Sequence, residues 1–319
     1  MSDIAVEAAE VTKSFGDHQV LRGLSLAVPR GTVYSLLGPN GAGKTTTVRI
    51  LATLARPDSG RVRVAGFDAL GQRREVRSRI SLTGQHAAVD AAQTGAENLR
   101  MAGRLAGLTR LQARQRAGEL LAQFGLADAG DRRASTYSGG MRRRLDLAAG
   151  LVSRPEVMFL DEPTTGLDPQ SRRQLWEIIG EFQRRGGTVL LTTHYMDEAE
   201  RLCDRLAIID HGQVIAAGTP PELIDRLGGQ HVVEFSVTGN SSDGSPKTPQ
   251  ETWHGLPGVE SVHADDGLIS LTVRQPHVTI PALLDAVSQQ GAELRHLTTR
   301  QASLEDVFVR LTGRHLREE

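Results

Sequence analysis

The sequence predicts an α/β protein with a parallel core sheet, followed by a smaller α+β domain. Three observations lead to this prediction. Short apolar strands alternate with helical stretches, which is typical of a parallel sheet with helices on its faces. A glycine-rich segment at 38–45 joins one strand to a helix. After 219–222, a helix start with proline in its first turn, the pattern changes to that of a different domain.

Length and composition narrow the classes of protein to consider. The chain has 319 residues, which is long for one average domain and suits a large domain with a small second one. Its 37 basic and 38 acidic residues are balanced, so net charge gives no reason to expect nucleic acid as a partner. The start of the chain does not resemble a signal peptide, and no apolar run approaches the roughly 20 residues that cross a bilayer. We expect a nucleotide-binding domain over 1–227 and an accessory domain over 228–319.

The elements of the first domain follow from periodicity and turn residues. Strands are expected at 20–28, 33–37, 61–64, 157–160, 188–191 and 206–209. A helix should begin in the glycine-rich segment and run to Leu54 with one apolar face. A helical insert is expected at 94–127, inside a helical subdomain at about 86–153, because Thr94 and Glu97 form a capping-box pattern before a leucine-rich stretch.

The second domain is predicted to place two helices on an antiparallel sheet. Strands are expected at 232–237, 259–264, 268–273 and near Leu294, and helices at 280–289 and 303–311. The segment 239–250 contains Ser, Asp, Gly and Pro with almost nothing apolar, so its composition indicates a flexible loop.

The segment 38–45, Gly-Pro-Asn-Gly-Ala-Gly-Lys-Thr, is a P-loop pattern. Its glycines allow successive backbone N–H groups to point at the phosphates of a nucleotide, assisted by the positive end of the following helix. Lys44 is expected to reach the β- and γ-phosphates, and Thr45 to offer its hydroxyl to Mg²⁺. The candidate phosphate-binding residues are Gly38, Pro39, Asn40, Gly41, Ala42, Gly43, Lys44, Thr45 and Thr46.

Two adjacent carboxylates end the apolar strand at 157–160. Side chains alternate along extended backbone, so Asp161 and Glu162 should point differently and serve two roles. Alone, this pattern also fits a strand that ends in solvated acids. With a P-loop in the same chain, we expect Asp161 near Mg²⁺ and Glu162 as the general base that polarises the attacking water.

Ser138, Gly139 and Gly140 stand at the start of a predicted helix, with Ser138 at its N-cap. Ser-Gly-Gly is a common helix start, but an open helix N-terminus also favours an anion, and the P-loop of the same chain belongs to a different part of the domain. The expected ligand is a γ-phosphate bound by a second copy of the chain. The arginines at 142–144 are interpreted as a solvated helix face with one member near a partner.

Together these segments resemble the nucleotide-binding domain of an ABC transporter, over about residues 3 to 225. The segment 137–141, Tyr-Ser-Gly-Gly-Met, keeps the serine and glycines of the Leu-Ser-Gly-Gly-Gln signature, although Met141 replaces its glutamine. The resemblance implies a P-loop NTPase fold with a parallel core sheet, an antiparallel β subdomain and a helical subdomain. It also implies that Gln85 is the Q-loop glutamine and touches Mg²⁺, that Asp168 belongs to the D-loop, and that His194 is the switch histidine. Phe15 resembles the aromatic residue that stacks on adenine.

The resemblance implies an ATP hydrolase in which two copies form a head-to-tail dimer around two ATP molecules. Catalysis would rest on Glu162, His194 and Lys44. The segments 303–313 and 137–146 resemble bacterial ATP-binding subunits of the daunorubicin and doxorubicin resistance type. Such subunits power drug export through a separate membrane permease, bound peripherally at the cytoplasmic face of the membrane. The alternative is a soluble ABC ATPase of the translation or DNA-repair type, but this chain has one cassette and no coiled-coil heptads.

Overall fold

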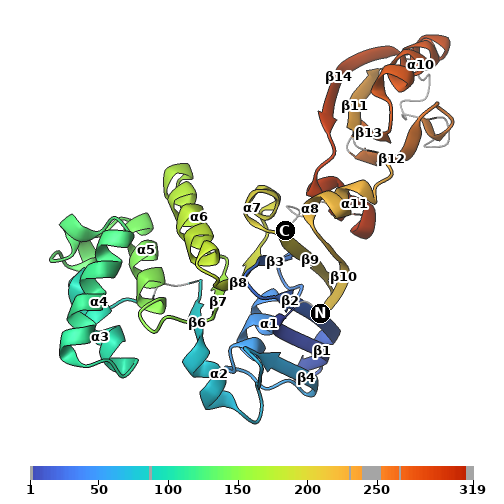
Figure 1. Ribbon diagram of the computed structural model, residues 1–319. Helices are drawn as coiled ribbons and strands as arrows, with labels where there is room; N and C mark the ends of the chain where they lie inside the picture. Colours follow the sequence, from blue (N-terminus) through green and yellow to red (C-terminus); the bar gives the residue numbers. More distant parts are fainter. Residues whose placement is uncertain (1–2, 86–87, 230, 239–252, 266, 314–319) are drawn as a thin grey trace. The chain divides into compact units, whose positions relative to one another are not determined.

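We describe the protein from a computed structural model, which covers residues 3–85, 88–229, 231–238, 253–265 and 267–313. The loop predicted at 239–250 lies outside these residues. The chain divides into two compact units, the first ending at Gly218 and the second beginning at Thr219 (Figure 1). The sequence placed this division at residues 227 and 228.

The first unit begins with an antiparallel sheet in the order β2-β1-β4-β5. Its strands are β1 (Ile4–Phe15), β2 (His18–Pro29), β4 (Ser59–Val64) and β5 (Phe67–Asp68). Along β1 the side chains alternate, and Val6 lies opposite Val28 on one side and Val64 on the other. The valines bury one face of this sheet, as period-two alternation requires.

A six-stranded sheet forms the centre of the first unit, in the order β10-β9-β3-β8-β7-β6. The strands are β3 (Val33–Leu37), β6 (Ile80–Thr83), β7 (Val157–Asp161), β8 (Thr188–Thr193), β9 (Arg205–Asp210) and β10 (Gln213–Gly218). All pairings are parallel except that of β10 with β9. The predicted α/β fold with a parallel core sheet is confirmed.

The central strands are buried on both faces, and alternate residues enter two different cores. Phe159 of β7 packs into the core shared with the antiparallel sheet, whereas its neighbours Met158 and Leu160 pack into the core shared with the helices. This burial explains the continuous apolar sequence of β7. It also fixes which way the carboxylate at the end of the strand points.

The helices of the first unit are α1 (Lys44–Leu51), α2 (Arg73–Arg79), α3 (Gly95–Leu105), α4 (Arg110–Gln123), α5 (Gly139–Gly150), α6 (Pro169–Arg184) and α7 (Met196–Leu202). Helix α1 begins in the P-loop as predicted but ends earlier than expected. Thr53 has a positive φ of 64°, so the chain turns away and Leu54 is 63% exposed.

Helices α3, α4 and α5 gather at one side of the central sheet (green in Figure 1). The predicted capping box is present, because Thr94 and Glu97 exchange their side-chain and backbone hydrogen bonds at the start of α3. The leucines are divided between two environments: Leu99 is fully buried, whereas Leu105 and Leu111 are 83% and 77% exposed. The sequence assigned all of them to one apolar pattern. In the part of the chain that the structure describes, no helix is both long and apolar enough to cross a membrane.

The second unit contains an antiparallel sheet in the order β12-β13-β11-β14. Its elements are α8 (Pro220–Asp225), β11 (His231–Thr238), β12 (Val259–Asp265), β13 (Leu268–Val273), α10 (Pro276–Gln289), β14 (Glu293–Gln301) and α11 (Leu304–Thr312). Leu283 and Val287 of α10 pack on one face of the sheet.

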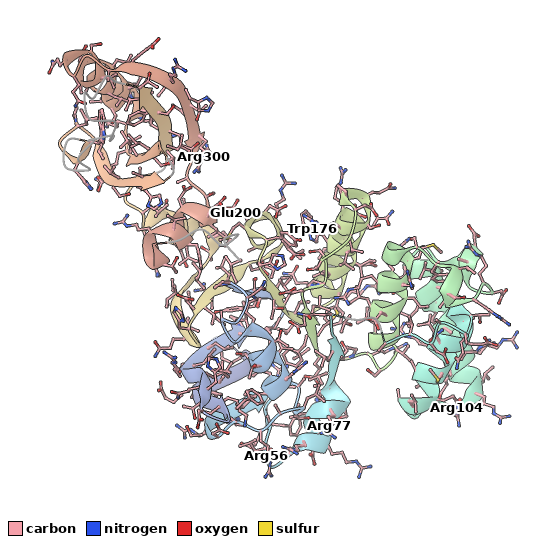
Figure 2. All side chains as sticks on the ribbon, turned by 180° about the vertical axis from the view of Figure 1, so that it is seen from behind. Arg56, Arg77, Arg104, Trp176, Glu200 and Arg300 are labelled. Atoms are coloured by element: carbon pink, nitrogen blue, oxygen red, sulfur yellow. The ribbon has the colours of Figure 1, made fainter. Side chains whose placement is uncertain are left out.

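The closing helix α11 differs from the expectation of two helices packed on one sheet. It contacts α8, and the Arg310 guanidinium donates to the carbonyl of Leu227. Its start is tied to the sheet by Arg300 of β14, which pairs with both Glu234 and Asp306 (Figure 2). Burial alone would raise the pKa of Asp306, but the Arg300 guanidinium and the backbone N–H of Ser303 hold it below its ordinary value.

Candidate functional site

The glycine-rich loop leaves β3 and enters α1 along a path that only glycine allows. Gly41 and Gly43 have φ values of 78° and 101°, in the left-handed region. A Cβ at Gly38 would lie 2.2 Å from the carbonyl oxygen of Ile209, and one at Gly43 would lie 2.6 Å from Leu21. The loop is therefore packed on its outer side. Asn40 and Gly41 at its tip are exposed, while Pro39 and Ala42 are buried.

Lys44 is the first residue of α1, and its side chain folds back over the loop. Its Nζ donates to the carbonyl oxygens of Gly38 at 2.7 Å and Pro39 at 2.9 Å, and the side chain is nearly buried. A cation that closes the loop in this way lies among the backbone N–H groups where a phosphate would bind.

Asp161 and Thr45 meet where β7 ends beside α1. Thr45 Oγ1 donates to Asp161 Oδ1 at 3.1 Å, and Thr192 of β8 donates to the same oxygen at 2.7 Å. A hydroxyl and a carboxylate beside a phosphate loop suit Mg²⁺, which keeps several waters and uses few protein ligands. Within the described ranges, no cluster of three or more His, Cys, Asp or Glu side chains could hold a metal ion.

Glu162 points away from Asp161, toward the loop after β8. Its φ is 48°, and its backbone N–H is fixed by the hydroxyl of Thr192 at 3.0 Å. His194 Nδ1 lies 3.6 Å from Glu162 Oε1, and this nitrogen is buried without a hydrogen-bond partner. The structure brings Lys44, Asp161, Glu162 and His194 to the carboxyl ends of β3, β7 and β8, where ligands bind in open α/β sheets.

Helix α5 begins at Ser138, whose Oγ accepts a hydrogen bond from the backbone N–H of Met141 at 3.2 Å. Ser138 and Gly139 are exposed, and nothing lies within 4 Å of a Cβ built on Gly139. Gly140 is different, because a Cβ there would lie 2.3 Å from Ser171 Oγ on α6. Glycine at this position therefore allows α5 and α6 to pack closely.

Asp168 is the N-cap of α6, and it fixes the start of this helix where Ser171 packs against Gly140. Its carboxylate accepts from the backbone N–H groups of Gln170 and Ser171 and from Ser171 Oγ at 2.6 Å. These bonds, first that of the Ser171 hydroxyl, lower the pKa of Asp168. Met141 packs partly buried against the helical core, so the residue that departs from the signature adds apolar contact.

Arg143 corrects the interpretation of residues 142–144 as a solvated face, because it is only 7% exposed. Its guanidinium donates to the carbonyl oxygens of Pro163, Gly84, Asp161 and Glu162. Burial lowers the pKa of Arg143 and raises that of Asp146, its partner at 3.7 Å. One side chain of α5 thus connects the turn after β7 with the segment that holds Gln85. A run of three arginines in the sequence gave no sign of which one would be buried.

Gln85, Gly139 and Thr165 line one pocket of about 360 Å³, which no P-loop residue enters. Thr46 lies half-buried on α1. Phe15, at the end of β1, is 56% exposed with the Lys13 ammonium 5.4 Å from its ring centroid. The predicted residues therefore form two separate groups: Thr46 extends the P-loop group, while Gln85 lies with the start of α5.

Glu198 was not singled out from the sequence, yet it supports the loop that carries His194. It lies on α7, fully buried, and accepts from Trp176 Nε1 on α6 at 3.0 Å. Burial raises the pKa of this carboxyl. Trp176 is labelled in Figure 2. The His194 ring stacks obliquely on Tyr195, with centroids 4.1 Å apart, and Tyr195 in turn lies under the Arg172 guanidinium.

Comparison with known proteins gives two family matches along the chain. Residues 21–165 match the model of the ABC transporter family, and residues 218–312 match that of the DrrA1-3-like ATP-binding protein C-terminal domain. Among solved structures, an ATP-binding subunit of an ABC transporter superposes with a TM-score of 0.64 at 28% identity, covering 70% of this chain and 93% of the other.

Curated relatives match almost the whole length. The daunorubicin/doxorubicin resistance ATP-binding protein DrrA of Streptomyces peucetius is 48% identical over 97% of this chain and 92% of its own. The Nod factor export ATP-binding protein I of Paraburkholderia xenovorans is 40% identical over the full length of both. The linearmycin resistance ATP-binding protein LnrL of Bacillus subtilis is 35% identical over 98% of this chain and all of its own.

Proposed function

This chain belongs to the DrrA-type ATP-binding subunits of ABC transporters and hydrolyses ATP, and we propose that this reaction drives the export of a drug, antibiotic or related hydrophobic compound. One observation carries the proposal: the likeness to resistance and export proteins extends over both units, including the C-terminal domain, which contains none of the proposed nucleotide-binding residues. The alternative, a soluble ABC ATPase of translation or DNA repair, is not favoured by these relatives.

In the proposed mechanism, the backbone of residues 38–43 and the Lys44 ammonium bind the β- and γ-phosphates, and Thr46 extends this contact at the start of α1. Phe15 offers an exposed ring on which adenine can stack. Thr45 and Asp161, whose side chains already meet, would hold Mg²⁺. Gln85 is proposed as a third ligand, although in this structure it lies with the start of α5. When bound, Mg²⁺ supplies charge neutralisation at the phosphates.

Glu162 is proposed as the general base, because its carboxylate lies at the carboxyl end of β7 but points away from the Thr45–Asp161 pair. It would accept a proton from the water that attacks the γ-phosphorus, as the bond to the leaving ADP oxygen breaks. His194 is proposed to contact the γ-phosphate, and its unpartnered buried Nδ1 beside Glu162 supports a role in orienting this carboxylate. A base-orienting pair of this kind is common in hydrolytic sites.

We propose that the site is completed by a second copy in a head-to-tail dimer. Ser138 and Gly139 are exposed at the N-terminus of α5, with Gly140 behind them, and the pocket that Gly139 lines contains no P-loop residue of the same chain. Donors of this kind stabilise charge that develops on a transferring phosphoryl group. Asp168 would lie at the same interface, since it fixes the start of α6 against α5.

The transporter is proposed to include a separate integral membrane permease, which places this chain at the cytoplasmic face of the membrane. The test is resistance in the native host. Deleting the gene should lower the tolerated concentration of at least one compound in a panel of anthracyclines and polyenes. Wild-type chain should restore the tolerance, and the Glu162→Gln variant should not. Unchanged tolerance throughout the panel, with the chain absent from washed membranes, would contradict the proposal.

A further inference from the structure

A second pocket, of about 500 Å³, lies in the first unit and is strongly basic. Four arginines from four separate segments line it: Arg30 after β2, Arg116 of α4, Arg154 before β7 and Arg185 after α6. Its volume is in the range of small-molecule sites. None of the residues proposed to bind nucleotide lines it.

This basic pocket lies at the opposite edge of the central sheet from the nucleotide site. Its lining residues Glu156 and Thr188 stand at the amino ends of β7 and β8, whereas Asp161 and Thr193 end these strands. At about 3.3 Å per residue, the two edges are roughly 16 Å apart. A ligand in the basic pocket would therefore not displace the nucleotide.

Glu156, the acidic residue in the lining, already forms ion pairs with two arginines. It pairs with Arg30 at 3.1 Å and with Arg79, and its pKa is lowered by these two guanidinium groups against the effect of burial. Arg30 also pairs with Asp3, at 2.8 Å, so these two arginines and two carboxylates together carry no net charge. The positive charge of the pocket therefore comes from its other arginines.

Arg154 and Arg185 are the arginines of the pocket that are most available to a ligand. Among the described residues, no carboxylate lies within ion-pair distance of Arg154, whose φ of 53° is unusual for a residue other than glycine. Arg116 pairs with Glu119 and also donates to the Leu151 carbonyl at 3.0 Å. Exposed Arg185 pairs with Glu181 of α6, and a surface contact of this kind is weak. A multivalent anion would compete well for these groups.

The remaining wall is apolar. Leu151 and Pro155 are buried, and Phe182 lies so close to Gly187 that a Cβ there would be 2.3 Å from its ring. A bare inorganic anion would leave this wall uncovered. A molecule with an apolar body and a charged head would fill both parts.

We infer that this pocket binds a phosphorylated organic molecule, with its phosphate among the four guanidinium groups and its apolar body against Leu151, Pro155 and Phe182. Phosphate suits the site because arginine binds its oxygens in pairs and with matching geometry. The phosphate can come from a soluble metabolite or from a lipid headgroup.

The test uses the full chain with its P-loop saturated by ADP and Mg²⁺, so that the nucleotide site takes no probe. The soluble probe is 1-naphthyl phosphate, with neutral 1-naphthol as its matched control, measured by calorimetry. The lipid probe is vesicles of phosphatidic acid in phosphatidylcholine, compared with pure phosphatidylcholine, measured by co-sedimentation. We expect the wild-type chain to bind one phosphate probe, and to prefer it at least tenfold over the uncharged control.

The Arg154→Ala/Arg185→Ala double variant should bind at least tenfold more weakly, because two charged hydrogen-bond donors are lost. Both side chains are exposed, so the fold and the ATPase rate should not change, and the single variant Arg154→Ala provides an intermediate step. Arg114→Ala, exposed on α4, removes the same charge outside the pocket and should bind like wild type. Failure of both probes to bind, undiminished binding by the double variant, or equal weakening by Arg114→Ala would overturn the inference.

Discussion

Glu162 is constrained at both its backbone and its side chain. Its positive φ turns the carboxylate away from Asp161, and the Thr192 hydroxyl and the neighbouring His194 fix where it points. A residue held in such a conformation is expected where orientation is needed for function. Glutamine has the same shape as glutamate, so Glu162→Gln tests the chemical role of the carboxylate while keeping the size of the side chain.

Glu162→Gln should lower kcat by about 10²- to 10⁴-fold, because the amide cannot accept the proton of the attacking water. Nucleotide affinity should be retained, since the P-loop is unaltered, and the variant should accumulate as an ATP-bound dimer. Phosphate release and size-exclusion chromatography measure the two effects. Glu177→Gln, an exposed carboxylate of α6, is the matched control. A turnover equal to wild type would refute the assignment of Glu162.

Arg143→Ala should destabilise the first unit by about 3 kcal/mol, because it leaves buried Asp146 without its cation and several carbonyls without a donor. It should also reduce kcat, since the turn that carries Glu162 loses its support. Urea denaturation measures the free energy of unfolding. Arg142→Ala, at the exposed neighbouring position, should change it by less than about 0.5 kcal/mol. Equal effects at both positions would contradict the structural distinction.

The difference between residues that could and could not be predicted has a physical basis. Lys44, Asp161 and Glu162 stand in patterns whose spacing follows from phosphate chemistry, so the sequence alone identifies them. Arg143 and Glu198 act through distant partners, the carbonyls after β7 and the indole of Trp176. Nothing in their neighbouring residues records such contacts, because tertiary packing creates them.

Helix α7 shows how an element is positioned by one buried acid. Glu198 faces Trp176 on α6 and holds the segment that follows His194. Helix periodicity predicts that some residues of α7 are buried. It does not predict that a carboxyl is one of them, because charged side chains are rarely buried fully.

Glu198→Gln should remove a pH dependence of stability. Burial raises the pKa of Glu198 in the folded state, so its stabilising contribution is complete below the ordinary glutamate pKa and is lost as pH rises through the raised value. The wild-type chain should therefore lose stability relative to the variant as pH rises above the ordinary glutamate pKa, and urea denaturation at several pH values measures this. Glu200→Gln, exposed on the same helix (Figure 2), should leave the dependence unchanged. A pH profile shared by wild type and Glu198→Gln would contradict this account.

Helix α3 carries one buried leucine, Leu99, and one exposed leucine, Leu105, and only the buried one should contribute to stability. Leu99→Ala should destabilise the chain by about 2–5 kcal/mol, because it opens a cavity in the helical core. Leu105→Ala should change stability little, since that side chain is 83% exposed. Thermal denaturation compares the two, and similar losses would mean that Leu105 is buried in solution.

At the scale of the whole chain, each unit has a core of its own. The first unit has two cores, one on each face of the central sheet, and the second has a core of β11, β13 and α10. The sequence predicted two domains from the change of pattern after 219–222, but it assigned α8 to the first. Helix α8 belongs to the second unit because it packs against α11, a contact that the local sequence does not reveal.

The position of α8 determines how a truncated chain should behave. Ending the chain after Gly218 should leave ATP binding intact and weaken dimerisation or permease coupling, because every predicted nucleotide residue precedes this point. Ending it after Leu227 should also leave ATP binding intact, but it strips α11 from α8 and exposes buried Leu223 and Leu227. The longer fragment should therefore aggregate more readily than the shorter one, because exposed apolar patches promote aggregation. Nucleotide titration and light scattering of both fragments measure this. Loss of ATP binding by the fragment ending at Gly218 would show that the nucleotide site depends on the second unit.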